Sequence, residues 1–283
     1  MVATRKDRYA TRGFVIERGL FDGATVQRHI DEALRLCRDK GRELTDWNGR
    51  PVAGGERFAD MTDSELLEQI LAIHFPHKLS RLFARALAHA ALVTVLQDII
   101  GPNVKCAQSM LFVKQPGKPG QAWHQDEYFI PTRDRSLAGA WIALDAATAD
   151  NGCLRVLPGS HRPGVLYPTR QHGNPEYDGA PEAYGYPDDP GDEIAVELAP
   201  GDVLFFNGYL LHSSRRNGAP AGTYRRSLVH HYLSAESLLP WNLGGLIEAT
   251  DDNRDIVMVS GRDPYAWKGL HDNNRPFIRT GTW

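Results

Sequence analysis

Two segments of the chain contain a histidine and an aspartate separated by one residue, His29-Ile30-Asp31 and His124-Gln125-Asp126. An imidazole and a carboxylate are two of the ligand types that bind Fe(II). On an α-helix, side chains at positions i and i+2 point about 200° apart, so a helical pair cannot bind one ion. On an extended strand the same spacing places both side chains on one face, roughly 6.5 Å apart along the backbone. The second pair is therefore the candidate metal site, and the first pair is expected on the surface of a helix.

A third ligand is needed to complete the face of two histidines and one carboxylate that leaves positions open on Fe(II). His212 is the best placed, because it follows the apolar run 202–211, which is typical of a strand that reaches the mouth of a barrel. His161 is expected in a turn or as a residue that positions a ligand. His230 and His231 are expected inside a strand, satisfied by hydrogen bonds. From the pattern alone, unrelated surface or core histidines remain the alternative.

Two adjacent arginines, Arg225 and Arg226, open a strand-like run, so their side chains must lie on opposite faces. A guanidinium inside an apolar pocket is costly unless a carboxylate pairs with it, and arginine favours bidentate pairing. Side-chain alternation places Arg225 on the same face as Ser227, Val229 and His231. It places Arg226 on the other face, with Leu228, His230 and Tyr232. The second set suits a face buried against helices, so Arg225 is expected to receive a carboxylate. The alternative is an exposed charge at a strand end.

The first third of the chain, which must support these residues, is predicted to be mostly helical. One amphipathic helix is expected over 24–40, with Gly41 as its stop. Another helix is expected over 80–100 and ends at Gly101. Between them, Thr62 and Glu65 have capping-box spacing, which predicts a helix that continues towards Pro76.

After Pro102 the sequence changes to short runs rich in β-branched and aromatic residues, which predict strands. Helices followed by strands argue against alternating βαβ units. The fold class is therefore mainly β with N-terminal helices, an antiparallel sandwich or jelly roll with the helices packed on one sheet. The strands are expected at 104–115, 138–144, 154–157, 193–198, 202–206 and 225–233.

The composition limits the function. The chain has 283 residues, 42% of them apolar, which is enough for a large domain with a buried core. Its 32 Lys and Arg against 35 Asp and Glu give a formal charge of −3 without a polybasic run, so neither nucleic acid nor a membrane is an expected partner. Cys37, Cys106 and Cys153 form no C-x-x-C pair, and the N-terminus shows no hydrophobic leader. A cytoplasmic protein is expected.

Seven segments occur in the same order as in the phytanoyl-CoA dioxygenase family of Fe(II)/2-oxoglutarate oxygenases, which the chain resembles from about Pro102 to Leu233. Each segment is weak alone, but the ordered set is specific. They are His124-Gln125-Asp126, Trp141-Ile-Ala-Leu-Asp, Asn151-Gly-Cys-Leu, Pro158-Gly-Ser-His161, Gly201-Asp-Val-Leu-Phe-Phe, His212-Ser-Ser and Tyr224-Arg225-Arg226.

The resemblance implies a cupin-like double-stranded β-helix with helices on its major sheet, in one domain over 1–283. The range 1–101 would be helical support, 102–233 the jelly-roll core and 234–283 a C-terminal extension. Iron would be bound by His124, Asp126 and His212.

The resemblance also implies how the cosubstrate binds. Arg225 would bind the distal carboxylate of 2-oxoglutarate, assisted by Ser214, and Trp141 would line that pocket. Related halogenases have Ala or Gly in place of the metal-binding aspartate, so the retained Asp126 implies a hydroxylase or a related oxidative enzyme instead of a halogenase.

The implied activity is a dioxygenase that uses Fe(II), 2-oxoglutarate and O₂ to hydroxylate a small molecule, with release of succinate and CO₂. Desaturation, epimerisation or cyclisation are alternatives within this enzyme class. A non-catalytic, metal-binding cupin-like sensor is the alternative outside it.

The segment Pro163–Gly191 is rich in Pro, Gly and Tyr, and it is expected to be either a surface insertion or a loop that covers the substrate. Between Arg170 and Arg215 there is no Lys or Arg, while nine acidic residues occur. Because a mouth of one charge sign repels ligands of the same sign, a neutral or cationic substrate is expected instead of a coenzyme A thioester. The nine residues are Glu176, Asp178, Glu182, Asp188, Asp189, Asp192, Glu193, Glu197 and Asp202.

Overall fold

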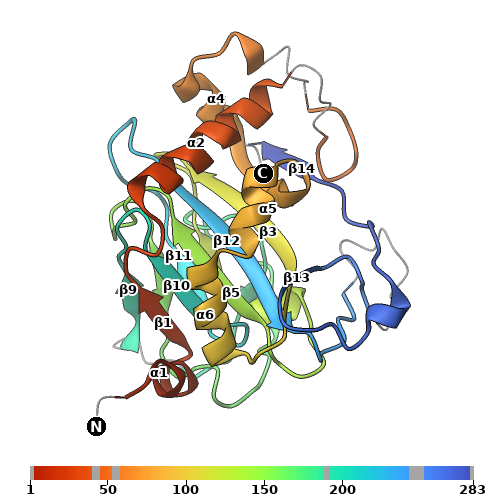
Figure 1. Cartoon of the computed structure of the whole chain (residues 1–283). Coiled ribbons are helices and arrows are strands. Elements are labelled where there is room, and N and C mark those ends of the chain that lie inside the picture. Colours follow the sequence, from red (N-terminus) through yellow and green to blue (C-terminus); the bar gives the residue numbers. More distant parts are fainter. Residues whose placement is uncertain (1–2, 40–44, 53–57, 188–191, 242–251, 281–283) are drawn as a thin grey trace.

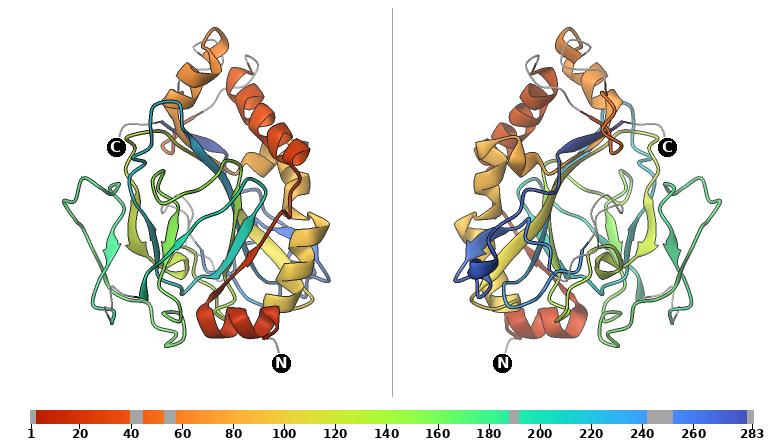
Figure 2. Two further views of the ribbon diagram at one scale, coloured as in Figure 1. Left: turned by 90° about the vertical axis from the view of Figure 1, so that its left-hand side faces the viewer. Right: turned by 90° about the vertical axis from the view of Figure 1, so that its right-hand side faces the viewer.

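The computed structural model describes residues 3–39, 45–52, 58–187, 192–241 and 252–280. The protein is mainly β, and its strands form an eight-stranded sheet, a four-stranded sheet and a two-stranded ribbon. All strand pairs within these sheets are antiparallel. Figure 2 shows the helices on one side of the large sheet and the smaller sheet on the other. The prediction of antiparallel sheets backed by N-terminal helices is thus confirmed.

The large sheet has the strand order β1-β10-β5-β12-β3-β2-β14, and β13 also pairs with β3 (Figure 1). Its strands are β1 (Phe14–Glu17), β2 (Ile70–His74), β3 (Val104–Lys114), β5 (Ala138–Ala143), β10 (Val203–Asn207), β12 (Arg225–Ser234), β13 (Val257–Ser260) and β14 (Phe277–Thr280).

The four-stranded sheet has the order β4-β11-β6-β9, and a separate ribbon pairs β7 with β8. These strands are β4 (Gln121–His124), β6 (Leu154–Val156), β7 (Thr169–Arg170), β8 (Glu182–Ala183), β9 (Ile194–Val196) and β11 (His212–Ser214). The helices are α1 (Arg5–Arg12), α2 (Gly23–Arg38), α4 (Asp63–Gln69), α5 (Arg81–Leu87), α6 (Ala90–Ile99) and α7 (Asp126–Phe129), with short 3₁₀ helices at Pro76–Lys78 and Ala266–Lys268.

The two faces of the large sheet pack against different partners. One face contributes residues such as Leu111, Leu228 and Ile278 to a core shared with the helices. The other face contributes Trp141 and Val229 to a second core, shared with the four-stranded sheet. Side-chain alternation along β12 therefore decides which of its residues meets the helices and which faces the space between the sheets.

The N-terminal helices agree only partly with their predicted bounds. The capping box of Thr62 and Glu65 is present, but α4 ends at Gln69, and the residues from Ile70 form strand β2 instead of more helix. A short apolar run buried on both faces does not distinguish a strand from a helix, which explains the error. The helix α2 ends at Arg38, and the predicted stop at Gly41 lies outside the described residues.

The single helix predicted over 80–100 is two helices, α5 and α6, because the backbone at His89 is extended (φ −59°, ψ 127°). By length and composition alone, the stretch Arg81–Ile99 would suffice to cross a membrane, which is weak evidence. Its residues Phe83, Leu87 and Leu96 are instead buried in the core against the large sheet.

The large sheet also extends beyond the predicted core range 102–233. Strands β1 and β2 come from the range predicted as helical support, and β13 and β14 come from the C-terminal extension. These strands have four or five residues each, so they show little periodicity of their own, and their pairing partners are far away in sequence. Both ends of the chain therefore contribute to the sheet that lines the site.

Candidate metal site and its cavity

The smaller sheet brings the three predicted metal ligands together. His124 is the last residue of β4, His212 is the first residue of β11, and the two are directly opposite in the antiparallel pair. This pairing requires a glycine at the entry to β4, because a Cβ on Gly120 would lie 1.7 Å from the carbonyl oxygen of Ser214. The Pro- and Gly-rich segment before β4 thus permits the close approach that aligns the two histidines.

The ligand atoms of His124, Asp126 and His212 all lie within 4.8 Å of one another. The Asp126 carboxylate oxygen Oδ1 is 3.7 Å from His124 Nε2 and 3.5 Å from His212 Nε2. Asp126 is not on a strand as predicted, because β4 ends at His124 and Asp126 begins α7. The intervening Gln125 is still extended (φ −128°, ψ 127°), so the expected same-side placement results.

The protonation of both histidines suits metal binding. His124 donates Nδ1–H to the carbonyl of Ala122 (2.7 Å), and His212 donates Nδ1–H to the carbonyl of Leu210 (3.0 Å). A carbonyl can only accept, so in each neutral ring the lone pair lies on Nε2, towards the centre of the cluster. Burial is the larger cause, and the neighbouring His212 the second, of a pKa lowered to about 3 for His124, which keeps that imidazole neutral.

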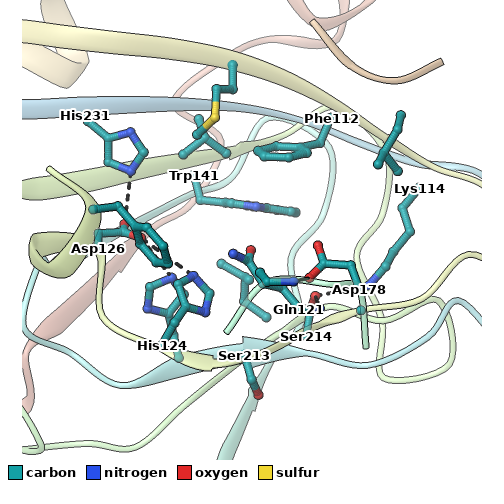
Figure 3. Close-up of a pocket in the computed structure, with 18 of the residues that line it drawn as sticks. Phe112, Lys114, Gln121, His124, Asp126, Trp141, Asp178, Ser213, Ser214 and His231 are labelled. Atoms are coloured by element: carbon teal, nitrogen blue, oxygen red, sulfur yellow. Dashed lines mark hydrogen bonds and ion pairs between the residues drawn. The ribbon is translucent and has the colours of Figure 1, made fainter. Parts of the chain in front are cut away.

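A fourth residue, His231 on β12, touches the cluster from the large sheet. Its Nε2 lies 3.0 Å from Oδ2 of Asp126, so it bonds the carboxylate oxygen that faces away from the other two histidines (Figure 3). Burial alone would raise the pKa of Asp126, but His212 and His231 outweigh it, so the carboxylate stays ionised. His231 is therefore a buried, hydrogen-bonded strand histidine as predicted, but its partner is one of the predicted metal ligands, which was not foreseen. His231 lies six residues after Arg225 on β12, so both side chains lie on the same face of the strand. This alternation was the sequence signal that places His231 at the site.

A cavity of about 320 Å³ extends from the cluster between the two sheets. Arg225 lies at one end of it, 5% exposed, with its guanidinium carbon 5.2 Å from the ring centre of Trp141. No carboxylate of the described residues pairs with this arginine, and its Nε has no hydrogen-bond partner. Burial lowers its pKa only to about 10, so the group remains charged at neutral pH. A buried, charged guanidinium of this kind is poised to bind an anion.

The hydroxyl of Ser214 lies at the same end of the cavity and is forced to act as a donor. Its oxygen accepts from Lys114 Nζ (3.1 Å) and from the Gln121 backbone N–H (3.2 Å). These two bonds use both lone pairs, so the hydroxyl proton must point elsewhere, and no acceptor among the described residues receives it. Lys114 is buried, and it also donates to the carbonyl of Gly152 (3.5 Å) and to that of Arg215. The role of Lys114 was not predicted.

The other candidates from the sequence lie away from the cluster. Arg226 forms a bidentate pair with Asp145, with two N–O distances of 2.7 Å, on the opposite side of β12 from Arg225. His230 bonds the hydroxyl of Tyr232 at 2.9 Å. His161 bonds the carbonyl of Ala10 (3.1 Å), so it anchors the N-terminal helix α1 and touches none of the ligands.

Of the described residues of the segment Pro163–Gly191, those that line the cavity are Asp178 and Ala180. The backbone N–H of Asp178 bonds the carbonyl of Gly120 (2.7 Å). This contact fits the interpretation of the segment as a loop that covers the site.

The acidic residues around this segment do not form an acidic mouth. Among those described, only Asp178 lines the cavity, which also contains Lys114, Arg225 and Arg279. Asp188 and Asp189 lie outside the described residues. The argument for a neutral or cationic substrate was therefore wrong in its premise, because arginines pair with four of these nine carboxylates outside the cavity. The pairs are Glu176 with Arg216, Glu182 with Arg170, Glu193 with Arg155 and Arg215, and Asp202 with Arg18.

Comparison with known proteins gives three findings. The family model described as phytanoyl-CoA dioxygenase matches residues 9–227. The peroxisomal phytanoyl-CoA dioxygenase of Bos taurus is 29% identical over 238 residues, which cover 80% of this chain and 67% of that protein. Two solved structures share the fold: the non-heme monooxygenase ThoJ (TM-score 0.68, 20% identity, 92% of this chain and 85% of that one) and the α-ketoglutarate-dependent epimerase SnoN (TM-score 0.61, 18% identity, 86% and 90%).

Proposed function

The chain belongs to the phytanoyl-CoA dioxygenase family and is an Fe(II)- and 2-oxoglutarate-dependent oxidoreductase, and we propose that His124, Asp126 and His212 hold its iron. The observation that supports this most is the convergence of two Nε2 atoms and one carboxylate oxygen, in the same cavity as a buried arginine that has no carboxylate partner among the described residues. With 2-oxoglutarate and O₂, the iron supplies the oxidation of a substrate C–H bond, while 2-oxoglutarate becomes succinate and CO₂.

The donor set fits Fe(II). Two neutral imidazole nitrogens and one carboxylate oxygen on one side of an ion match the facial triad of non-haem iron oxygenases, which leaves positions open for ligands. The outer hydrogen bonds to the Ala122 and Leu210 carbonyls, and from His231 to Asp126, fix the orientation of all three ligand side chains.

The opposite end of the cavity fits the distal carboxylate of 2-oxoglutarate. Arg225 supplies the charge, and Ser214 supplies a hydroxyl proton that has no acceptor among the described residues. Lys114 orients that hydroxyl by donating to its oxygen. Burial, and next the nearby Arg225, lower the pKa of Lys114 well below its usual value, so the charge at this end comes from Arg225. Trp141 packs against the Arg225 guanidinium and keeps water from this end of the cavity.

The two sheets on either side of this cavity support the finer fold assignment, a double-stranded β-helix of the jelly-roll type. The retained Asp126 favours hydroxylation of a small molecule over halogenation. Epimerisation has one observation in its favour, since the solved structure of SnoN, with a TM-score of 0.61, is titled an epimerase. A cytoplasmic location stays a prediction.

The test is an anaerobic titration with Fe(II) and 2-oxoglutarate, followed by O₂ and a measurement of succinate. We expect both components to bind and succinate to form, and the Asp126→Ala variant to form none. Binding without succinate in the wild-type protein would instead indicate the metal-binding sensor. Once a substrate is found, a product heavier by one oxygen atom indicates hydroxylation, and an unchanged mass indicates epimerisation.

A further inference from the structure

A row of side chains crosses four neighbouring strands of the large sheet and lines the cavity: His74 on β2, Met110 on β3, Val229 on β12 and Trp141 on β5. Ile73, the neighbour of His74, belongs to the core shared with the helices, so His74 faces the other way. His231, which bonds Asp126, lies on β12, two strands from β2. Two strand spacings are roughly 10 Å, so a small molecule can reach from His74 to the metal ligands.

His74 is a buried side chain that can both donate and accept a hydrogen bond. It is 8% exposed, its ring stacks on Phe277 with ring centres 4.1 Å apart, and neither ring nitrogen has a hydrogen-bond partner among the described residues. Burial lowers its pKa to about 3, so the ring is neutral and offers one donor and one acceptor. Buried polar groups are almost always hydrogen-bonded, so these unmet nitrogens point to a ligand in the cavity.

The backbone directly after His74 is strained. Phe75 has left-handed dihedral angles (φ 55°, ψ 43°), which a bulky residue rarely adopts, and it is fully buried. Its backbone N–H donates to the carbonyl of Ser109 (2.8 Å), and its ring packs beside Trp241 and Phe277. Strained residues persist where the surrounding structure fixes them, and they cluster at ligand sites. The turn at Phe75 thus ends β2 directly after His74 and fixes that residue at the cavity wall.

The charges of the loaded cavity are balanced. Fe(II) and the dianion 2-oxoglutarate cancel each other, and Asp126 balances Arg225. Burial lowers the pKa of Arg279 to about 10 and the nearby carboxylate of Asp178 opposes this, so these two charges also balance. Lys114, whose pKa burial lowers well below its usual value, donates to three protein oxygens at the cosubstrate end. The described residues that line the cavity therefore leave no spare charge to select a charged substrate.

The remaining walls near His74 are apolar. Ile130 and Trp241 line the cavity, and they belong to the same buried cluster as Phe277, on which His74 stacks. An apolar pocket with a few placed polar groups is the usual form of a small-molecule site, in which the polar groups fix the orientation of the ligand. A hydroxyl suits a neutral imidazole in such a place, because it donates and accepts without carrying charge.

We propose that His74 hydrogen-bonds a hydroxyl group of the primary substrate, whose apolar body packs against Ile130 and Trp241. The substrate class is then a small, uncharged alcohol, held by His74 on one side and reaching the iron on the other. This assignment rests on the proposed function and names the substrate of the same site. It keeps the uncharged substrate that was one of the expectations from the sequence, on the basis of His74 instead of the acidic residues.

The experiment measures whether His74 and a ligand hydroxyl interact. Benzyl alcohol and cyclohexylmethanol are titrated beside ethylbenzene and ethylcyclohexane, in which a methyl group replaces the hydroxyl. The protein is loaded with Fe(II) and 2-oxoglutarate without O₂, and binding is followed by ligand-observed NMR. We expect at least one alcohol to bind and to lose affinity on the order of 10-fold in His74→Phe, while its hydrocarbon loses none. If the wild-type protein binds neither alcohol, or if His74→Phe binds them as tightly, the subsite is overturned.

Charged analogues test whether the substrate is uncharged. We expect benzylamine and benzoate to bind the loaded wild-type protein more weakly than benzyl alcohol, because an ion would lose its hydration in this cavity without gaining a counter-ion. If either ion binds as tightly as benzyl alcohol, the uncharged class is overturned.

Two further variants separate hydrogen bonding from structure. His74→Gln keeps a donor and an acceptor, so it should bind the alcohols more tightly than His74→Phe does. Equal binding by these two variants would overturn hydrogen bonding by His74. His230→Phe is the matched control, because His230 is a buried histidine that bonds Tyr232 on the other face of the sheet. It should leave the affinities for alcohol and hydrocarbon unchanged, and a loss specific to the alcohols would contradict the assignment to His74.

Stability gives a readout that needs no ligand. His74→Phe removes a polar group that is unmet among the described residues, so it should raise the urea concentration at the midpoint of unfolding. His230→Phe breaks a hydrogen bond and should lower that midpoint. A lower midpoint for His74→Phe would show that His74 has a partner within the fold, which would overturn its role as a ligand-binding residue.

Binding of 2-oxoglutarate to the Fe(II)-loaded wild-type protein is measured first. Its absence would refute the proposed function. If 2-oxoglutarate binds but His74→Phe does not weaken the binding of an alcohol, only the hydroxyl subsite fails.

Discussion

The helix α2 and the end of strand β4 present the same two residue types at the same spacing, and the two pairs differ completely in surroundings. In α2, His29 is 2% exposed, donates to the Thr25 carbonyl (2.7 Å) and packs beside aromatic rings, while Asp31 is exposed and accepts from Gln27 (2.8 Å). The helical rotation separates the two side chains, so the surface placement expected for the pair was wrong for His29. At β4, an extended backbone turns His124 and Asp126 to the same side, where their ligand atoms and that of His212 lie within 4.8 Å of one another.

Strand β12 shows the same contrast for two neighbouring arginines. Arg225 faces the cavity and has no carboxylate partner in the part of the chain that the structure describes, whereas Arg226 forms a bidentate pair with Asp145. Residue type gives each side chain its chemistry, but backbone direction decides whether that chemistry meets a ligand or another side chain. Four comparisons test this conclusion.

Removing each aspartate should give the largest difference. Asp126→Ala deletes the only carboxylate of the ligand set, so we expect iron binding and succinate formation to fall to background. Asp31→Ala removes an exposed side chain and should leave both within about twofold of wild type. Iron content and succinate yield are measured for both variants. Similar losses in the two would contradict the assignment of Asp126 as a metal ligand.

Neutralising each arginine should give the next effect. Arg225→Gln removes the charge that we assign to the distal carboxylate, so the KM for 2-oxoglutarate should rise on the order of 10- to 100-fold. Arg226→Gln breaks the bidentate pair with Asp145 and should act on the melting temperature, with little change in KM. A larger KM effect from Arg226→Gln would show that the register of β12 is shifted by one residue.

The two adjacent histidines of β12 provide a subtler comparison. His231→Phe removes the hydrogen bond that orients Asp126, and we expect iron affinity to fall about 10- to 100-fold. His230→Phe removes a bond to Tyr232 remote from the ligands, so it should lower the free energy of unfolding and leave iron affinity unchanged. Equal iron affinities in the two variants would remove His231 from the site.

Replacing His77, which is not one of the proposed metal ligands, should give the smallest effect. That effect is a change in how the free energy of unfolding depends on pH. Burial lowers the pKa of His77 to about 4 from its ordinary 6.5, so unfolding takes up a proton between these values. The folded protein then loses stability as pH falls from 6.5 to 4, by up to about 1.4 kcal/mol per pH unit. His77→Asn should reduce this slope in metal-free protein, as measured by urea unfolding, whereas His271→Asn, at an exposed position, should leave it unchanged.

The parts of the site that could be predicted have local signals. The extended spacing of His124 and Asp126, the apolar run before His212 and the alternation along β12 each depend on a few consecutive residues. The same alternation grouped His231 with Arg225, but a role for His231 required knowing that Asp126 lies opposite. Lys114 gave no such signal, because a lysine at the end of a strand is ordinarily exposed.

The edge strands β2 and β14 could not be predicted for a different reason. Each has only four or five residues, and a segment this short becomes a strand only through the partner with which it pairs. Here the partners Ala72 and Arg279 are about 200 residues apart in sequence, so nothing near either residue indicates the pairing. His74 and Arg279 were missed together with these strands.

The pairing of β14 with β2 also sets an order in which the protein matures during synthesis. The ribosome completes the metal ligands and Arg225 before it makes the residues from Phe277 to Thr280. Until those residues arrive, β2 is an open sheet edge, which invites pairing with other chains. A chain stalled or cleaved before Phe277 would thus contain all three proposed metal ligands, while the cavity beside them lacks the strand that supplies Arg279 to its lining. Pulse proteolysis of stalled chains would test this order, because β2 would be cleaved faster before β14 is made than after it.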